Sequence, residues 1–254
     1  MTIESARAAA ALSAEEIRQK VAEFEWYHTI DLGGGILTPG QYDLAPLIDN
    51  YGIPESLAGK SVLDVGPAHG FFAFEFEKRG AERVVTSELP NWTDHDGREH
   101  FDQDDPAFRR DEEYHRGAFG FAIQARRSRV ERCFCSVYDL TPERIGMFDL
   151  VFCASVLLHL TDPLRALYGI RRVCRDQAIV CTGIDTHLLV AEQNRALFVG
   201  TPDGHAFWLP TMTCLEQMAI AAGFARVERV STFRLKSKDG LFNTPHGTIR
   251  ALVA

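Results

Sequence analysis

Residues 61–80 read Ser61-Val62-Leu63-Asp64-Val65-Gly66-Pro67-Ala68-His69-Gly70, then Phe71-Phe72-Ala73-Phe74-Glu75-Phe76-Glu77-Lys78-Arg79-Gly80. After two further residues the chain continues with Arg83-Val84-Val85-Thr86-Ser87-Glu88. The apolar, β-branched run at 61–65 is typical of a buried parallel strand. Gly66 and Gly70 bracket a turn in which a ligand can approach the backbone closely. An amphipathic helix is expected over 71–79, followed by a second strand that ends on Glu88. The stretch therefore predicts a strand–turn–helix–strand unit.

Glycines in the first turn and an acid at the end of the second strand are typical of a nucleoside-binding site. In such a site the turn holds the polar end of the ligand, and Glu88 accepts hydrogen bonds from two ribose hydroxyls. A dinucleotide site requires the spacing G-x-G-x-x-G. Here only Gly66 and Gly70 are present, and Pro67 lacks the amide donor that a phosphate would use. Dinucleotide binding is therefore disfavoured, and a unit that binds nothing is the structural alternative.

The pattern Leu63-Asp64-Val65-Gly66-x-x-x-Gly70 resembles the first motif of the class I S-adenosylmethionine-dependent methyltransferases. That family usually has a glycine where this chain has Ala68. The resemblance implies an α/β fold with a Rossmann-like, doubly wound, mostly parallel seven-stranded sheet and an antiparallel edge hairpin. It also implies S-adenosyl-L-methionine as the cofactor. The residues expected to contact this cofactor are Tyr27, Asp64, Gly66, Gly70, Glu88, Asp139, Leu140 and Ala154.

Three further segments, 26–32, 156–159 and 207–210, resemble the group of enzymes that carboxymethylate a wobble uridine in tRNA, and their shorter small-molecule relatives. The tRNA enzymes hold the extra carboxylate of their cofactor with cationic and aromatic side chains just before the glycine motif. This chain has no Lys or Arg between Lys20 and Lys60, and an unpaired buried carboxylate would be costly. We therefore expect O-methylation of a hydroxyl on a small molecule, such as a sugar, glycoside or natural product. A tRNA (carboxy)methyltransferase and a non-catalytic cofactor-binding module are the alternatives.

Composition limits the partners and the compartment. The 254 residues, 46% of them hydrophobic, suffice for one α/β domain with a large core. We expect an N-terminal helix and aromatic, glycine-rich lid over 1–57, and a methyltransferase domain over 58–254 with an insertion at about 89–129. The net charge of -8 disfavours general nucleic-acid binding. The six scattered cysteines are typical of reduced thiols in the cytoplasm. The chain also lacks an apolar run long enough to span a membrane. We therefore expect a soluble cytoplasmic protein, and it could form a homodimer.

The N-terminal loop and the insertion carry the candidate acceptor contacts. The loop at 26–40 combines Trp26, Tyr27 and His28 with the triple glycine at 33–35, which favours a lid. A hydrophobic staple that holds the N-terminal helix to the core is the alternative. The insertion is dense in acids and histidines, which could bind Mg²⁺ but more commonly form a solvated loop, so we assign no metal ligand. The predicted substrate contacts are Trp26, Trp92, Tyr114 and Trp208, and Glu192, Gln193, Asn194 and His205 are further possibilities.

Later strands place the catalytic candidates. Asp139 follows a third strand at 130–137, where the family places an acid that binds the adenine amino group; an N-cap ahead of residues 141–143 is an equal alternative. A fourth strand at 148–154 leads to His159, which we choose as general base because imidazole titrates in the right range. Packing of the strand-to-helix turn is an equally good explanation of His159, and His28 is the second candidate base. Strands at 178–184, 227–233 and 248–253 complete the predicted sheet.

Overall fold

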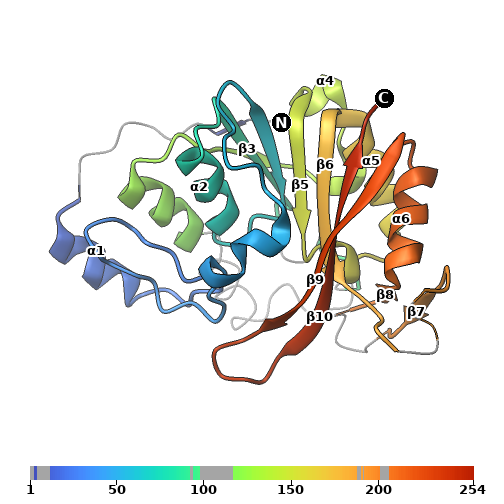
Figure 1. The fold of residues 1–254 in the computed structure, drawn as a ribbon. Coiled ribbons are helices and arrows are strands. Elements are labelled where there is room, and N and C mark those ends of the chain that lie inside the picture. Colours follow the sequence, from blue (N-terminus) through green and yellow to red (C-terminus); the bar gives the residue numbers. More distant parts are fainter. Residues whose placement is uncertain are drawn as a thin grey trace.

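The computed structural model describes residues 3–4, 12–91, 94–97, 117–187, 190, 192–200 and 206–254. They form an eight-stranded sheet and a separate two-stranded one (Figure 1). The large sheet contains β1 (Ile3–Glu4), β2 (Ser61–Val65), β3 (Arg83–Glu88), β4 (Glu131–Phe134), β5 (Phe148–Ala154), β6 (Cys174–Gly183), β9 (Arg226–Lys236) and β10 (Asn243–Leu252). The small sheet pairs β7 (Ala196–Phe198) with β8 (Trp208–Pro210).

The strand order β1-β4-β3-β2-β5-β6-β10-β9 confirms the predicted fold. Strands β2 to β6 of this sheet are paired in parallel, while β10 runs antiparallel to both β6 and β9 and so forms the edge hairpin. The short β1 adds an eighth, antiparallel strand beyond β4. Because the chain proceeds outward from β2 to β4 and then returns to β5, the order reverses between β2 and β5. Ligands of open α/β sheets bind outside the carboxyl ends of the strands at such a switch point.

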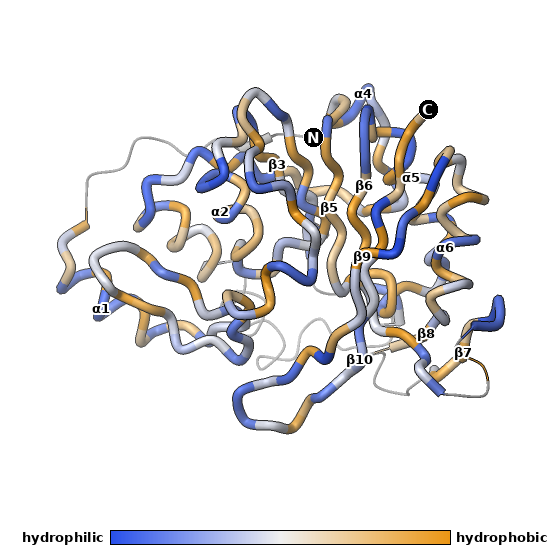
Figure 2. The backbone as a smooth tube through the Cα atoms, in the orientation of Figure 1, coloured by the Kyte–Doolittle hydropathy of each residue, from blue (hydrophilic) through white to orange (hydrophobic). Residues whose placement is uncertain are grey.

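Helices cover both faces of the sheet (Figure 1). One face carries α1 (Ala14–Val21), the 3₁₀ helix η1 (Ala45–Tyr51), α2 (Phe71–Lys78) and a helix that includes 117–126. The other carries η3 (Val137–Asp139), α4 (Pro142–Ile145), η4 (Leu157–His159), α5 (Pro163–Val173) and α6 (Met212–Ala221). Each face has its own apolar cluster, and Figure 2 shows the hydrophobic residues concentrated on the central strands. No helix in the described ranges is both long and apolar enough to span a bilayer.

Side chains cap the starts of two helices. At α1 the Ser13 hydroxyl accepts from the Glu16 amide (3.2 Å) and the Glu16 carboxylate accepts from the Ser13 amide (2.7 Å), which forms a capping box. At α6 the cap is Thr211, whose hydroxyl accepts from the Cys214 amide. Thr213 lies in the first turn of α6 and accepts a hydrogen bond from Arg229.

Candidate cofactor and acceptor site

The glycine turn after β2 has left-handed backbone at three positions. Gly66 has φ 71°, Ala68 has φ 47° and Gly70 has φ 88°. The conformation of Ala68 costs a residue with a Cβ some energy, which explains why glycine suits this position better. A Cβ on Gly66 would lie 2.5 Å from Val156 Cγ2, and one on Gly70 would lie 2.1 Å from Phe119 Cε2. Both glycines are therefore required by packing as well as by backbone conformation.

Asp64 is a buried acid without a full set of partners. Its side chain is 2% exposed, and its Oδ2 has no hydrogen-bond partner among the described residues. Burial raises the pKa of this carboxyl to about 8, with a smaller contribution from the charge of Glu88, while a hydrogen bond from the Ala73 amide opposes the rise. A buried, unpartnered carboxyl oxygen costs free energy unless a ligand satisfies it. A cationic group such as an ammonium would both pair with it and favour its ionised form.

Glu88, at the end of β3, is held by Arg132 of β4. Arg132 Nε and Nη2 donate to the two carboxylate oxygens at 2.7 and 2.8 Å. The guanidinium in turn lies over the rings of Phe119 (5.0 Å) and Phe134 (5.1 Å). A carboxylate has about four acceptor positions, so Glu88 keeps capacity for ribose hydroxyls while Arg132 fixes its orientation. The sequence pattern identified Glu88 but not Arg132, which comes from a strand 44 residues further along the chain.

The segment with the aromatic residues packs onto the glycine turn. His69 Nδ1 accepts from the Tyr27 amide at 2.9 Å, and the Trp26 ring meets the His69 ring edge-on at 5.6 Å. His28 is 5% exposed, and its ring lies 6.0 Å from that of Phe71 at the start of α2. These contacts are those of a staple that holds the segment to the core. A lid function stays a prediction.

Burial strongly affects His28 as a candidate base. It lowers the pKa of this imidazole to about 3, and Nδ1 has no partner among the described residues. The ring is therefore neutral near pH 7 and a weak proton acceptor. It can still accept or donate a hydrogen bond to a ligand through the unpartnered nitrogen.

The loop after β5 carries Ser155 and His159 at the switch point. Ala154 ends the strand half-buried, and Ser155 has a left-handed φ of 55°. His159 closes η4 and is exposed. Ser155 Oγ lies 3.1 Å from Nε2 of His246, a residue of β10 that the sequence motifs did not single out.

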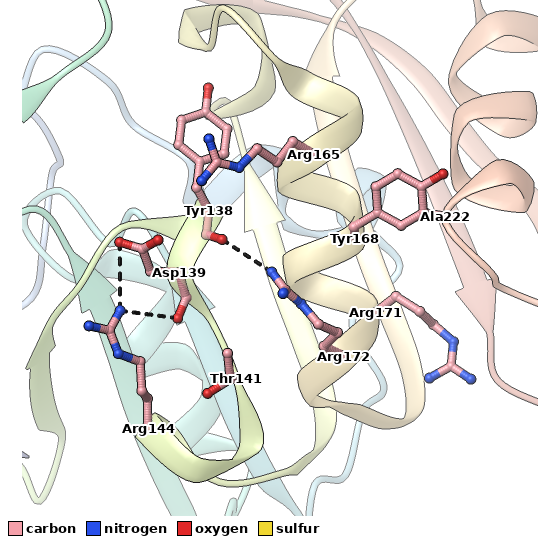
Figure 3. Close-up of a pocket in the computed structure, with 9 residues that line it drawn as sticks. All are labelled: Tyr138, Asp139, Thr141, Arg144, Arg165, Tyr168, Arg171, Arg172 and Ala222. Atoms are coloured by element: carbon pink, nitrogen blue, oxygen red, sulfur yellow. Dashed lines mark hydrogen bonds and ion pairs between the residues drawn. The ribbon is translucent and has the colours of Figure 1, made fainter.

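Asp139 and Leu140 differ in their surroundings. The Asp139 side chain is half-exposed and pairs with Arg144 at 3.6 Å. It lines an open groove of about 700 Å³ along α5 that also contains Arg165, Arg171 and Arg172 (Figure 3). The Leu140 side chain is fully buried, so only its backbone can face a ligand. N-capping by Asp139 is not observed: the N-cap of α4 is Thr141, with no side-chain hydrogen bond.

Comparison with known proteins identifies the family. A family model described as a methyltransferase domain matches residues 40–229. This chain belongs to the class I S-adenosylmethionine-dependent methyltransferases. It is 26% identical over 177 residues to a tRNA U34 carboxymethyltransferase of Desulforapulum autotrophicum, with 68% of this chain aligned to 46% of that protein. The chain thus spans about half the length of this curated relative.

Solved structures show the same fold. The N-terminal domain of EvdMO1, determined with S-adenosylhomocysteine and D-fucose, matches with a TM-score of 0.67 at 17% identity, covering 98% of this chain and 100% of that one. Magnesium protoporphyrin IX methyltransferase from Synechocystis PCC 6803 with bound S-adenosylhomocysteine matches with a TM-score of 0.51 at 16% identity, covering 78% and 76%. At such identities the likeness concerns the fold alone.

The residues of the methyltransferase fit its cofactor. The methionine end of S-adenosylmethionine carries an ammonium, which suits the unpartnered Oδ2 of Asp64. The ribose hydroxyls suit the carboxylate of Glu88. These residues would hold the cofactor at the glycine turn.

Trp208, a predicted substrate contact, lines a small apolar cavity. Its Nε1 donates to the Thr161 carbonyl at 3.1 Å, and its ring lies 4.8 Å from that of Phe198. The cavity, of about 260 Å³, also contains Leu157 and Met218. The Thr161 amide and hydroxyl both donate to Asp96 at 2.6 Å, so this part of the insertion folds back onto the start of α5. Trp92 and Tyr114 lie outside the described residues.

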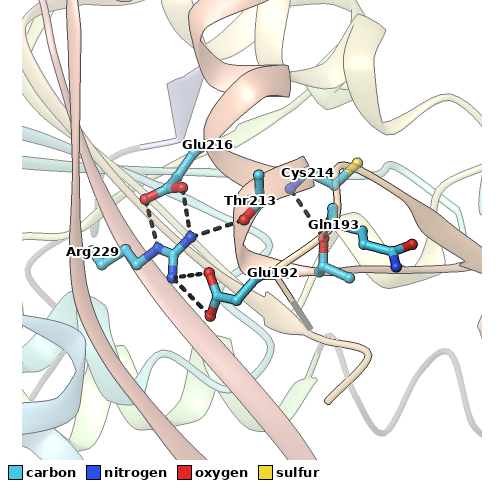
Figure 4. Close-up of polar contacts among 7 residues, drawn as sticks. Glu192, Gln193, Thr213, Cys214, Glu216 and Arg229 are labelled. Carbon is cyan, nitrogen blue, oxygen red and sulfur yellow. Dashed lines mark hydrogen bonds and ion pairs between the residues drawn. The ribbon is translucent and has the colours of Figure 1, made fainter. Parts of the chain in front are cut away.

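Two of the possible acceptor contacts are engaged elsewhere (Figure 4). Arg229 Nη1 pairs with Glu192 Oε2 at 3.2 Å and Arg229 Nε pairs with Glu216 Oε1 at 2.8 Å. The Gln193 carbonyl accepts from the Thr211 hydroxyl at 2.5 Å. These contacts anchor the chain between β6 and β7 to α6 and β9. His205 lies outside the described residues, as does most of the acidic insertion, and in the remaining part no three metal-ligating side chains come together.

Proposed function

We propose that the protein transfers the methyl group of S-adenosylmethionine to a hydroxyl of a small molecule, with a sugar or glycoside as the first acceptor class to test. The observation that carries the methyltransferase assignment is Asp64, a buried carboxyl with an unpartnered oxygen beside the glycine turn. When bound, the cofactor supplies a methyl group made electrophilic by the sulfonium. The D-fucose in the structure of the EvdMO1 domain supports a sugar acceptor.

The chain's own residues would hold the acceptor and remove its proton. The carboxyl ends of β5 and β6 face the switch point, so the loop after β5 is positioned to orient a hydroxyl in line with the methyl group. His159 is the more suitable of the two predicted bases, because it is exposed while His28 has a pKa of about 3. The apolar cavity beside Trp208 offers space for a non-polar part of the acceptor.

A tRNA wobble-uridine (carboxy)methyltransferase is the second candidate function, and the curated relative favours it. The structure brings two cations to the N-terminal segment from elsewhere in the chain. Lys238 Nζ donates to Thr29 Oγ1 at 2.6 Å, and Arg126 donates to the Asp31 carbonyl. Both side chains keep further donors, but among the described residues each is held at 29–31 and forms no hydrogen bond with the glycine turn at 66–70. We therefore rank ordinary methyl transfer first.

Calorimetric titration tests the proposal. We expect S-adenosylmethionine and S-adenosylhomocysteine to bind the wild type in the micromolar range. Loss of a hydrogen bond to a charged group costs about 1.5–3 kcal/mol, so Asp64→Asn and Glu88→Ala should each bind about tenfold or more weakly. Tighter binding of carboxy-S-adenosylmethionine would favour the tRNA function. Wild-type protein that binds none of the three would overturn the assignment.

Activity assays then separate the remaining alternatives. Methyl transfer to hydroxylated acceptors, with and without Mg²⁺, distinguishes an enzyme from a cofactor-binding module. Tight cofactor binding with no turnover on sugars, phenols or tRNA would favour the module.

A further inference from the structure

Ser155 and His246 form a hydrogen-bonded pair at the carboxyl edge of the sheet. Ser155 directly follows β5, and His246 of β10 lies opposite Gly183 at the end of β6. Ser155 Oγ is 3.1 Å from His246 Nε2. His246 is 3% exposed, whereas Ser155 is only half-buried. The serine is therefore the more accessible member of the pair.

The surroundings of His246 determine which nitrogen carries the proton. Nδ1 lies 3.1 Å from the Thr244 carbonyl, which can only accept, so Nδ1 must donate. In the neutral ring Nε2 then has the lone pair, and the Ser155 hydroxyl donates to it. Burial lowers the pKa of His246, and the hydrogen bond with Thr244 opposes part of this shift. Because burial has the larger effect, the resting ring is neutral. The ring also faces Phe233 at 5.9 Å, and no described residue forms an ion pair with it.

The backbone at Ser155 shows that this position is under a special constraint. A φ of 55° is unfavourable for a residue with a Cβ, and glycine would adopt it without strain. Strained residues at the carboxyl edge of a sheet are typical of functional sites. The Ser155 amide also donates to the Cys181 carbonyl at 2.8 Å, which holds the turn against β6.

We propose that Ser155 and His246 form a proton relay for the acceptor hydroxyl, Ser155 as the contacting group and His246 as the base behind it. This inference rests on the proposed methyl transfer to oxygen. The acceptor oxygen bonds to the methyl carbon while the carbon–sulfur bond breaks and its electron pair stays on sulfur. The acceptor proton passes to Ser155 Oγ as the Ser155 proton passes to His246 Nε2. The imidazolium gains the positive charge that the sulfonium loses, so charge is conserved.

The relay makes His159 a competing base rather than a partner. His159 is the exposed last residue of η4, four residues after Ser155, and a proton taken there would go to solvent. Removal of the base typically costs 10²- to 10⁴-fold in rate. The two candidates can therefore be separated by parallel substitutions.

The first test measures the tautomer of His246 without any acceptor. In protein labelled with ¹⁵N-histidine, long-range ¹H–¹⁵N spectra distinguish protonated from unprotonated ring nitrogens, and loss of one signal set in His246→Gln assigns the residue. We expect the proton on Nδ1, and Ser155→Gly should shift the Nε2 resonance without changing the tautomer. A proton on Nε2 would overturn the relay, because that nitrogen could not accept another.

The second test measures methyl transfer to D-fucose and to 4-nitrophenol, which ionises without help. Ser155→Gly removes the hydroxyl and relieves the strained φ, which offsets part of the cost of leaving His246 Nε2 unpaired. His246→Gln keeps a polar group near the Nε2 position but has no basicity. We expect both to lower kcat for D-fucose about 10²-fold or more and to change the rate for 4-nitrophenolate only several-fold. His187→Gln, a change at an exposed histidine beyond β6, should match the wild type.

The outcomes distinguish the two proposals. A large loss in His159→Gln with normal rates in Ser155→Gly and His246→Gln would overturn the relay while supporting methyl transfer. Equal losses on both acceptors would indicate a structural role and would also overturn it. Wild-type protein that binds the cofactor but methylates neither probe would count against the proposed acceptor class, and the His246 tautomer would still decide whether the relay can operate.

Discussion

Individual polar atoms at the cofactor edge lack the partners that buried groups normally have. Asp64 Oδ2 and His28 Nδ1 are both buried without a hydrogen bond among the described residues. Most buried polar side-chain atoms in proteins are satisfied. Four other unpartnered atoms occur among the described residues, on Arg126, Thr182, Thr248 and Arg250. It is therefore the position of Asp64 beside the glycine turn that indicates a ligand site. The unpaired atoms lower the stability of the protein without its ligand, and a bound ligand would offset this cost.

The raised pKa of Asp64 predicts how stability depends on pH. The carboxyl titrates at about 8 in the folded protein and at 3.8 in its ordinary state. Between these values the unfolded chain releases a proton that the folded chain retains, so stability falls as pH rises through this window. In Asp64→Asn this contribution is absent. Thermal unfolding without cofactor should therefore show a larger loss of Tm from pH 5 to pH 8.5 in the wild type than in the variant, and parallel curves would contradict the assignment.

At the level of residues, local patterns predicted some site members and could not predict others. Asp64 and Glu88 follow from their place at the ends of predicted strands, and the structure places both at the expected edge. Ser155 directly follows a predicted strand, but its left-handed backbone was not foreseen. His246 meets it across 91 residues of sequence, a contact that only the pairing of β10 with β6 creates.

At the level of elements, most strands of the parallel core were predicted closely because each is a short apolar run between turn residues. The exception is the strand predicted at 130–137, which ends at Phe134 as β4, while residues 137–139 form η3. The strand β5 begins and ends at the predicted residues. The strand β6 starts four residues before the predicted apolar run, because residues ahead of that run also pair with β5 and β10. Residues 45–51 form a 3₁₀ helix with a proline in its first turn rather than an α-helix. Local helix propensity cannot distinguish an α-helix from a 3₁₀ helix here, because the type of helix depends on packing against the sheet.

The pairing of β3 with β4 predicts a role for Arg132. Arg132→Ala leaves the largely buried Glu88 carboxylate without its bidentate partner, since the two side chains are 12% and 16% exposed. We expect a loss of about 2–3 kcal/mol in unfolding free energy, and weaker binding of S-adenosylhomocysteine because Glu88 is no longer oriented. Chemical denaturation and calorimetry measure the two effects.

Arg83→Ala is the matched control for this pair. Arg83 and Glu131 join the same two strands with nearly the same bidentate geometry, at 3.1 and 2.9 Å, but are 37% and 26% exposed. Exposed ion pairs contribute about 0–1 kcal/mol, so this variant should be nearly as stable as the wild type and bind the cofactor normally. If both arginine variants behave alike, the proposed positioning by Arg132 is wrong.

At the scale of the whole molecule, the site is assembled from segments that are far apart in the chain. The glycine turn at 66–70, the N-terminal segment at 26–28, the loop after β5 and the start of β10 meet at one edge of the sheet. The Lys238 amide at the hairpin tip also donates to the Gln41 carbonyl at 2.9 Å, joining the C-terminal hairpin to the N-terminal segment. The chain folds these distant parts around a single pair of apolar clusters.

This arrangement predicts where cofactor binding protects the backbone. S-adenosylhomocysteine at 100 times its Kd should stabilise the folded state by about 2.7 kcal/mol. Because the Tyr27 amide is bound by His69 of the glycine turn, hydrogen exchange should slow in the N-terminal segment as well as at 61–70. The surface network around Arg229 serves as an internal control with little local change. Asp64→Asn, which should bind about tenfold more weakly, should keep only about 1.4 kcal/mol of this stabilisation at the same ligand concentration. Protection confined to 61–88 would show that the N-terminal segment is only a staple, whereas joint protection would support its predicted role as a lid.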